Sequence, residues 1–306
     1  MNDKLRIGKQ KFKLQYSILN IQYLIFILLF SSCEKDITLD VPLPESKVVV
    51  DGYVEIDQPV YVILTRNAPY FSPITPNTLV NSVERGAKVT VSDGTNTEQL
   101  IELQGTFDSI NVGGLYIAPT MKGNAGKTYA LKVITTKGET LTASTYLSLP
   151  VPLDSVWFKI QENYDSLGFV WAHLTDPDTM GNCYRWFAKR LNKDDAFLAP
   201  FGSTFEDKFI NGKSFDFAYN RGSIDNSSAI DDNNIEEGFF KVDDTIVVKF
   251  CSTDRSVFEF WRDAEGQVSG NGSPFASPSN IHSNIVGGLG LFAGYSSSYD
   301  TIIARR

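Results

Sequence analysis

The sequence has few residues arranged for acid–base or nucleophilic catalysis. Only two histidines occur, His173 and His282, and neither lies at metal-ligand spacing from a second ligand residue. His173 alternates with Phe169 and Trp171 in a strand-like run, which favours a packed or partly exposed strand residue over a ligand or a catalytic base. The nucleophile-elbow pattern G-x-S-x-G is absent. A Ser-His-Asp set can still assemble in space, but we expect a non-enzymatic protein without catalytic residues.

Two acidic segments and one glycine-rich segment are the remaining candidates for ligand sites. Residues 229–238 and 175–182 carry clustered carboxylates, which calcium prefers, but neither has the spacing of an EF-hand loop. Residues 285–294 are rich in glycine but match neither the dinucleotide fingerprint nor the P-loop pattern. Solvated acidic loops and close strand packing are therefore the expected roles, with a loose calcium site as the alternative for the carboxylates. We expect no cofactor and no metal.

The N-terminus has the layout of a bacterial export signal. Five basic residues precede a largely apolar run at residues 16–30. Its unbroken apolar part is much shorter than the roughly 20 residues that a transmembrane helix needs. Two serines then lead directly to Cys33, which resembles the lipobox at which bacterial lipoproteins are diacylated and cut. We therefore predict a signal peptide at residues 1–32 and lipidation of Cys33.

The residues after this cysteine suggest where the mature protein faces. Lys35 and Asp36 resemble the Lys-then-acid export tag of many surface lipoproteins of the Bacteroidota. Two acyl chains hold a protein on a membrane where one chain is marginal. Residues 33–46 contain two prolines and many charges and read as an extended, lipidated tether. We expect an outer-membrane lipoprotein that is exposed at the cell surface, with periplasmic retention as the alternative.

The net charge argues against one class of partner, and the two remaining cysteines raise the question of a disulfide. The whole chain carries 28 basic and 36 acidic residues, and cleavage before Cys33 leaves 23 and 35, a net charge of −12. Such a surface repels phosphate backbones, so we expect no nucleic-acid binding. Cys183 and Cys251 can form one disulfide in an oxidising compartment. Both lie in apolar contexts, so we expect two buried free thiols, with the disulfide as the alternative.

The mature chain is predicted to be mainly all-β. Residues 47–149 consist of short β-branched and aromatic runs with period-two alternation, separated by turn residues, which indicates a β-sandwich of about seven strands, Ig-like or carboxypeptidase-regulatory-like. No helix-length periodic segment occurs before residue 150. Two prolines flank Val151, and we place a domain boundary there, with a second β-rich domain at residues 150–306.

One short helix is expected in the second domain, at residues 254–266. Thr253 or Asp254 can cap it, and Val257, Phe258 and Trp261 share one face. The following tail is rich in Gly, Ser, Asn and Pro and ends in a short strand.

Several blocks of sequence together resemble a known family. They are "VVVDGYV", "VILTRNAPYF", "GAKVTVSDG", "LPVPLDSVWF", "LTDPDTMGNCYRWF" and "SNIVGGLGLFAGYS". In this pattern the chain is similar to a Bacteroidota lipoprotein family of unknown function that is often encoded beside TonB-dependent outer-membrane receptors. The resemblance implies a TonB-dependent receptor as partner and supplies no catalytic residues. Cys183 stands where the family commonly has a tyrosine.

Two hypotheses for function follow. The first is a non-enzymatic lipoprotein that assists a TonB-dependent transporter in ligand capture or uptake, with Tyr70 and Phe71, in a loop after a strand, as candidate partner contacts. The second is a surface glycan-binding or envelope-structural module that works without a transporter.

Overall fold

The computed structural model describes residues 45–68, 75–107, 110–222, 238–270 and 280–306, and the side chains of 76–77, 105–112 and 269–270 lie outside that description. Glu45–Arg306 form one compact unit. Its first part contains β1 (Val48–Glu55), β2 (Pro59–Arg66), α2 (Pro76–Ser82), β3 (Lys88–Ser92), β4 (Thr97–Gln99), β5 (Ile101–Phe107), β6 (Ile110–Lys122), β7 (Lys127–Ile134) and β8 (Thr140–Leu147).

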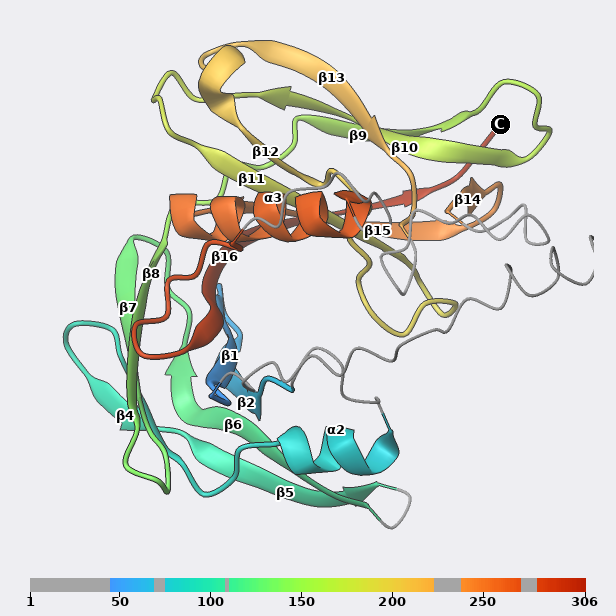
Figure 1. Ribbon diagram of the computed structural model, residues 1–306. Coiled ribbons are helices and arrows are strands. Elements are labelled where there is room, and N and C mark those ends of the chain that lie inside the picture. Colours follow the sequence, from blue (N-terminus) through green and yellow to red (C-terminus); the bar gives the residue numbers. More distant parts are fainter. Residues whose placement is uncertain (1–44, 69–74, 108–109, 223–237, 271–279) are drawn as a thin grey trace, which may run out of the picture. The chain divides into compact units, whose positions relative to one another are not determined.

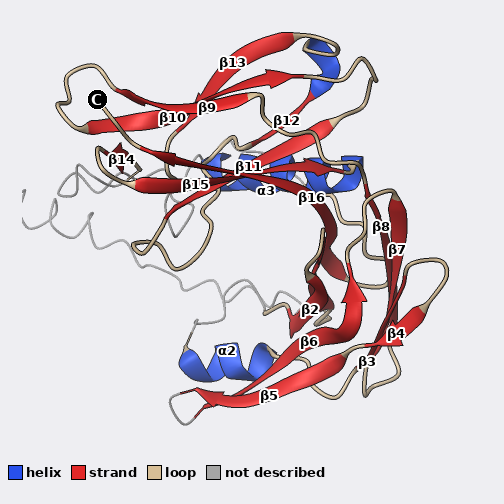
Figure 2. Cartoon of the chain, turned by 180° about the vertical axis from the view of Figure 1, so that it is seen from behind, coloured by secondary structure: helices blue, strands red, loops and turns tan. Residues whose placement is uncertain are grey.

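The second part has the same predominance of strands. It contains β9 (Ser155–Ile160), β10 (Leu167–Thr175), β11 (Cys183–Arg190), β12 (Thr204–Glu206), the 3-10 helix η1 (Asp207–Phe209), β13 (Ser214–Tyr219), β14 (Phe240–Lys241), β15 (Thr245–Thr253), α3 (Arg255–Gly270) and β16 (Leu289–Ile303). The expected all-β class is thus confirmed, and Figure 2 shows strands throughout both parts.

One large sheet runs through the compact unit and two smaller sheets pack on it. The large sheet has eight strands in the order β12-β11-β15-β16-β1-β2-β6-β5. The smaller sheets have the orders β4-β3-β7-β8 and β13-β10-β14, with β9 paired to β10. Figure 1 shows α3 lying against the large sheet beside β11, β15 and β16.

The first core lies between β1, β2 and β6 of the large sheet and the sheet β4-β3-β7-β8. Alternate residues of β1 and β2 point into it, including Val48, Val50, Val62 and Leu64. Alternate residues of β7 and β8 face them from the second sheet, in strands whose other face is exposed. Period-two patterning therefore produces the two-layer sandwich that the sequence predicted.

The second core lies between β11 and β15 of the large sheet and the sheet of β9, β10 and β13. Tyr184, Trp186, Val248 and Phe250 supply it from the large sheet. Strand β10 supplies every second residue, and Phe215 and Phe217 of β13 pack against the same cluster. By register, these large-sheet residues point to the same side of the sheet as the residues of the first core.

Strand β16 belongs to both parts of the chain. Its first half pairs in parallel with β1, from Val49↔Leu289 to Glu55↔Tyr295, and its second half pairs antiparallel with β15. The boundary predicted at residues 149/150 falls between β8 and β9, where the chain passes from the first core to the second. Phe292 of β16 nevertheless completes the first core. Whether the first part folds alone stays a prediction.

Both helices differ in detail from the expectation. The predicted helix exists as α3, and Asp254 caps it by accepting a hydrogen bond of 3.0 Å from the Val257 amide. It continues past Gly266 to Gly270. Gly266 does not adopt the positive φ of a helix-ending glycine, so it only lowers the helix propensity at that position. The seven-residue helix α2 was not expected. Its signal is local, a Thr75–Thr78 capping box followed by Pro76 at the first turn.

Candidate functional site

The residues singled out for anchoring and partner contact lie outside the described residues. These are Cys33, Lys35, Asp36, Tyr70 and Phe71. Their roles stay predictions.

Ion pairs and hydrogen bonds hold the chain just before residues 69–74. Arg66, the last residue of β2, pairs with Glu84 at 2.5 Å and also with Glu139. One residue on, the Asn67 amide donates to the Lys47 carbonyl at 3.1 Å, and the Lys47 amide donates to the Asn67 side chain at 2.6 Å. The last described residues before this segment therefore lie beside residues 46–47, where the predicted tether ends.

The two cysteines are free and buried in this structure, so the disulfide considered above is not formed. They occupy neighbouring strands, but Cys183 pairs with Thr253 and Cys251 pairs with Arg185, which makes them diagonal rather than opposite. A diagonal pair is about 7–8 Å apart, beyond the usual Cα separation of a disulfide. Burial raises the pKa of each thiol to about 11, so both stay protonated at neutral pH.

A row of stacked tyrosines crosses three adjacent strands on the side of the large sheet that α3 packs against. The rings of Tyr61 on β2 and Tyr53 on β1 stack with centroids 5.1 Å apart, and Tyr53 stacks on Tyr295 of β16 at 5.9 Å. Alternation places Tyr53 and Tyr61 here because Val54, Val60 and Val62, their neighbours in β1 and β2, fill the first core. We call this surface, with Asp51, Glu55, Ile63 and Tyr299, the tyrosine face.

Glu55 is the polar centre of one end of the tyrosine face. Its carboxylate accepts hydrogen bonds from Lys249 Nζ at 2.5 Å, Ser297 Oγ at 2.7 Å and the Tyr299 hydroxyl at 2.5 Å. Burial, followed by this contact with Glu55, raises the pKa of the Tyr299 hydroxyl. Because all three donors come from β15 and β16, Glu55 ties β1 to the second part of the chain.

Asp51 lies at the solvent-exposed end of the tyrosine face, opposite the end that carries Glu55. It is exposed and sits between Ile63 and Leu291 on the neighbouring strands. The surrounding protein raises the pKa of its carboxyl, mainly by partial loss of solvent, while a hydrogen bond from Tyr53 opposes that shift. Within the described residues, no basic side chain forms an ion pair with Asp51. A carboxylate of this kind suits a cationic or hydrogen-bond-donating group of a partner.

Apolar side chains extend the tyrosine face toward the edge of the large sheet. By register, Ile63 is followed by Leu115 of β6 and Leu103 of β5, and Tyr61 by Ile117 and Ile101. Ile101 is 56% exposed and Leu103 is 46% exposed, on the edge strand. Aromatic and aliphatic side chains contiguous over several strands are typical of protein interfaces.

A buried arginine fastens α3 beside the tyrosine face. The Arg185 guanidinium lies 3.4 Å from the centroid of the Trp261 ring and donates to the Tyr295 hydroxyl at 3.0 Å. Trp261 donates its indole N–H to the same hydroxyl at 2.9 Å. Loss of solvent is the main cause that raises the pKa of Tyr295, which therefore acts as a neutral acceptor. These contacts hold α3 in place at the border of the tyrosine face.

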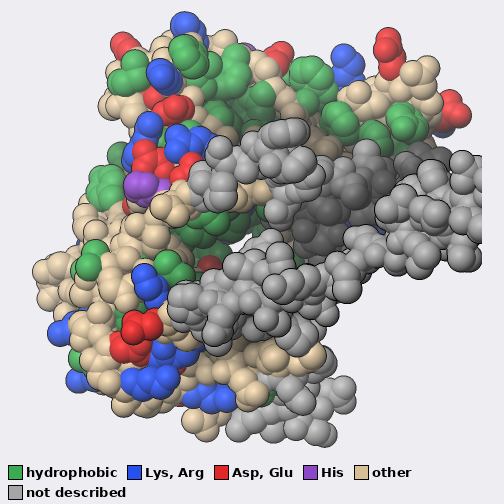
Figure 3. Space-filling view, viewed as in Figure 1, with side chains coloured by type: hydrophobic (Ala, Val, Ile, Leu, Met, Phe, Trp, Pro, Cys, Tyr) green, Lys and Arg blue, Asp and Glu red, His purple; other side chains and the backbone are tan. Residues whose placement is uncertain are grey.

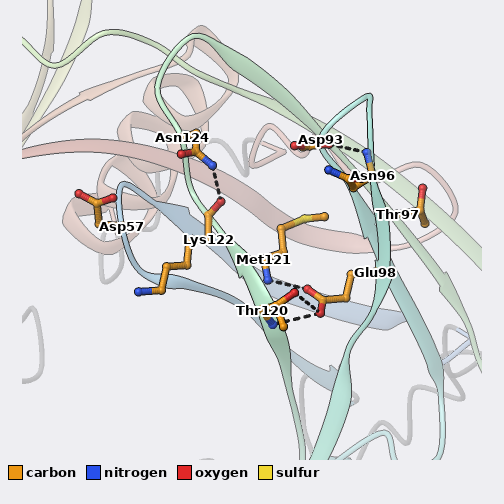
Figure 4. A pocket seen from close by; sticks show the side chains of 9 residues that line it. All are labelled: Asp57, Asp93, Asn96, Thr97, Glu98, Thr120, Met121, Lys122 and Asn124. Atoms are coloured by element: carbon orange, nitrogen blue, oxygen red, sulfur yellow. Dashed lines mark hydrogen bonds between the residues drawn. The ribbon is translucent and has the colours of Figure 1, made fainter.

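A separate polar hollow opens between the ends of strands in the first part (Figure 4). It measures about 570 Å³ and is lined by Asp57, Asp93, Asn96, Thr97, Glu98, Thr120, Met121, Lys122 and Asn124. Glu98 is already bonded to the amides of Thr120 and Met121. Asp93 accepts from two backbone amides and from Lys127, and these bonds hold the pKa of its carboxyl well below its usual range. Glu98 thus ties β4 to the end of β6, and Asp93 holds the turn between β3 and β4.

Among the described residues, no group of three or more metal-ligating side chains lies together. In the same part of the chain, no helix is both long and apolar enough to span a bilayer.

The tyrosine face was missed at the sequence level, although it left a signal. In the β1 segment, Asp51, Tyr53 and Glu55 alternate with the buried Val50, Gly52 and Val54, which marks a strand whose second face carries polar and aromatic groups. What could not be read from sequence is that β1 lies in the middle of a sheet, between β2 and β16.

Comparisons with known proteins give one result. No curated protein matches the chain. A family model described as a domain of unknown function, DUF4249, matches residues 34–301. The match begins one residue after Cys33 and spans the whole described body except its last residues. The chain therefore belongs to the DUF4249 family.

Proposed function

We propose that this protein is a non-enzymatic recognition lipoprotein of the bacterial envelope, which assists a TonB-dependent transporter in ligand capture or uptake. The observation that carries the proposal is the tyrosine face with its apolar extension over β5 and β6. Tyrosine supplies large contact area together with a hydrogen-bonding group, and it is enriched where proteins bind one another. The exposed carboxylate of Asp51 favours a partner that brings a positive charge or a hydrogen-bond donor to that position.

The position of the anchor supports the proposal. Lipidation at Cys33 leaves about a dozen residues before the compact unit begins at Glu45. An extended segment of that length spans about 35–40 Å. The protein would therefore stand within reach of a neighbouring membrane protein, with Lys35 and Asp36 directing it to the cell surface. The resemblance named above points to a TonB-dependent receptor as that neighbour.

The contacts within the tyrosine face support a binding role. Glu55 is engaged by three donors, and the tyrosines are held neutral: burial raises the pKa of Tyr61 to about 12. Groups engaged in this way position a surface and do not exchange protons near neutral pH.

The experiment is a mild-detergent pull-down of the tagged, full-length protein from its own membranes, with quantitative mass spectrometry. We expect a TonB-dependent receptor to be enriched with the wild type and depleted with Tyr61→Ala/Ile63→Ala. Tyr70→Ala/Phe71→Ala tests the contacts predicted from sequence. The matched control is Tyr146→Ala, because Tyr146 is 46% exposed on β8, in a different sheet. If no receptor is enriched with the wild type, the transporter role is wrong.

The anchor is tested separately by labelling cells with a fatty-acid analogue. The wild type should take up label, whereas Cys33→Ala should lose it and keep its signal peptide. Label on the Cys33→Ala protein would place the acyl chains elsewhere.

A second candidate function, a glycan-binding or envelope-structural module that works without a transporter, is favoured by a different surface. That surface lies on the sheet of β9, β10 and β13.

A further inference from the structure

The outward side of the sheet of β9, β10 and β13 carries an aromatic strip. Alternate residues of these strands fill the second core, including Phe158, Val170 and Phe217. The residues between them point away from that core, and two of these are the cross-strand pair Trp157 and Trp171. Figure 3 shows hydrophobic side chains at the surface in this upper part of the molecule.

The rings of the strip are ordered into two stacks. Trp157 and Trp171 have centroids 6.2 Å apart with an angle of 23° between their planes. Phe169, two residues from Trp171 on the same strand face, stacks on Phe239 at 5.4 Å and 16°. Tyr164, which is 37% exposed, packs against Phe239 at 5.0 Å. We call these five residues the outer aromatic strip.

Trp157 and Trp171 are partly exposed, and polar side chains lie at the margins of the strip. On β13, Ala218 pairs with Trp171, so no large side chain stands beside the indole on that strand. Lys159 lies 5.2 Å from the Trp171 ring centroid. At the other end, His173 Nδ1 lies 2.6 Å from Asp216 Oδ1, and both side chains are exposed, by 37% and 52%. This contact orients the imidazole and leaves its Nε2 edge available.

We propose that the outer aromatic strip binds a neutral carbohydrate chain, with pyranose rings stacked on Trp157 and Trp171. A pyranose has an apolar face of C–H groups, which packs against the electron-rich face of an aromatic ring, and hydroxyl groups around its edge. The strip supplies both kinds of contact, because His173 and Asp216 lie where edge hydroxyls of a stacked sugar can be hydrogen-bonded.

The spacing of the rings favours a chain over a single sugar. Trp171 and Phe169 are two residues apart along β10, which is about 6.6 Å in a strand. Successive sugars of one chain can therefore meet successive rings. A protein partner or a second copy of this chain is the competing occupant. The mixed charges of Lys159 and Asp216 give neither an anionic nor a cationic ligand an advantage, which favours an uncharged one.

This inference does not depend on the transporter role, because its surface lies on a different sheet from the tyrosine face. Binding is measured by affinity electrophoresis and by isothermal titration with detergent-purified, full-length protein. The probes are a neutral β-1,4-glucan, a β-1,3-glucan, an α-1,4-glucan and a β-mannan, with an anionic polysaccharide as the charged comparison. We expect at least one neutral probe to bind and the anionic one not to.

Four variants test the residues. Trp157→Ala should weaken binding at least tenfold, Trp157→Phe should retain part of it, and His173→Ala should weaken it several-fold. Phe209→Ala is the matched control, because Phe209 is 78% exposed outside the strip. Far-ultraviolet circular dichroism checks that each variant is folded. If Trp157→Ala is unfolded, Trp157→Phe, which keeps an aromatic ring, takes its place in the test.

Three outcomes would overturn the proposal. The first is that no neutral probe binds the wild type, and the second is that binding is unchanged in both Trp157→Phe and His173→Ala. The third is that the wild type is a dimer by analytical ultracentrifugation and Trp157→Ala is a monomer, since the strip would then be an interface between copies. Receptor enrichment in the pull-down should be the same for Trp157→Phe and wild type, which separates this site from the transporter role.

Discussion

Replacement of Glu55 by glutamine should destabilise the protein through Lys249. The side chains of Glu55 and Lys249 are 16% and 12% exposed and meet at 2.5 Å. The amide of the introduced glutamine can still accept one hydrogen bond, but it leaves the nearly buried ammonium group without a counter-charge. Removing one partner of a fully buried pair costs about 3–5 kcal/mol, and exposed pairs contribute about 0–1 kcal/mol. For a pair with this exposure we expect a loss of about 2–3 kcal/mol in the free energy of unfolding.

A double-mutant cycle isolates the pair from the other contacts of its members. Lys249→Met should cost less than Glu55→Gln, because Ser297 and Tyr299 still donate to the Glu55 carboxylate. In Glu55→Gln/Lys249→Met neither charge is left alone, so the double variant should be more stable than the sum of the single losses, by a coupling of about 2 kcal/mol.

The measurement is urea unfolding followed by circular dichroism, with stabilities extrapolated to water and slopes compared between variants. The control cycle uses Arg255 and Glu259 on α3, whose side chains are 53% and 24% exposed, and its coupling should be about 0.5 kcal/mol or less. A Glu55–Lys249 coupling no larger than that of the control pair would refute the reasoning, because it would mean that solvent screens the pair in spite of its burial.

Four further predictions follow from other features. The thiols of Cys183 and Cys251, whose pKa burial raises to about 11, should react with a thiol reagent at pH 8 only when urea unfolds the protein. Burial raises the pKa of Asp194, but its contacts with Arg190 and Arg221 outweigh burial and hold this pKa below the value in the unfolded chain, about 3.9. The stabilisation from Asp194 is therefore complete above about pH 3.9 and is lost as pH falls through the folded-state pKa. Asp194→Asn should flatten the decline in the free energy of unfolding at acidic pH, measured by urea unfolding. Gly290→Ala should cost at least about 3 kcal/mol, because φ is +101° and a Cβ would lie 2.0 Å from the Val50 carbonyl oxygen. A fragment of residues 45–149 lacks β16 and should melt below the full-length protein by circular dichroism; equal melting temperatures would support the independent domain predicted from sequence.

Local features of the fold were readable from sequence because they depend on neighbouring residues. The alternation in β7 and β8 and the apolar face of α3 are set within a few residues, and all three elements are present. The pairing of β1 with β16 depends on residues 240 positions apart, such as Val49 and Leu289, and no local pattern encodes it. Parallel pairing also lacks the connecting turn that reveals a hairpin.

In the candidate sites, too, the position of a residue on its own strand could be read from sequence, whereas its neighbours on other strands could not. His173 was expected on a strand with Phe169 and Trp171, and the structure places it there. The outer aromatic strip depends in addition on which strand lies opposite, since Trp157 and Trp171 come together only because β9 pairs with β10 in that register. Trp186 is fully buried in the second core, whereas Trp157 and Trp171 are partly exposed and point away from it.

The place of β16 in the sheet also sets the order in which the protein can fold. Strand β1 is synthesised long before β16, one of its two neighbours in the sheet, which lies about 240 positions further along the chain. Until β16 is available, one edge of β1 has unpaired amides and carbonyls, and the first core lacks Phe292. Contacts of such long sequence separation form slowly. Completion of the large sheet must therefore wait until β16 has been synthesised, and the first core stays incomplete while the second part of the chain is made.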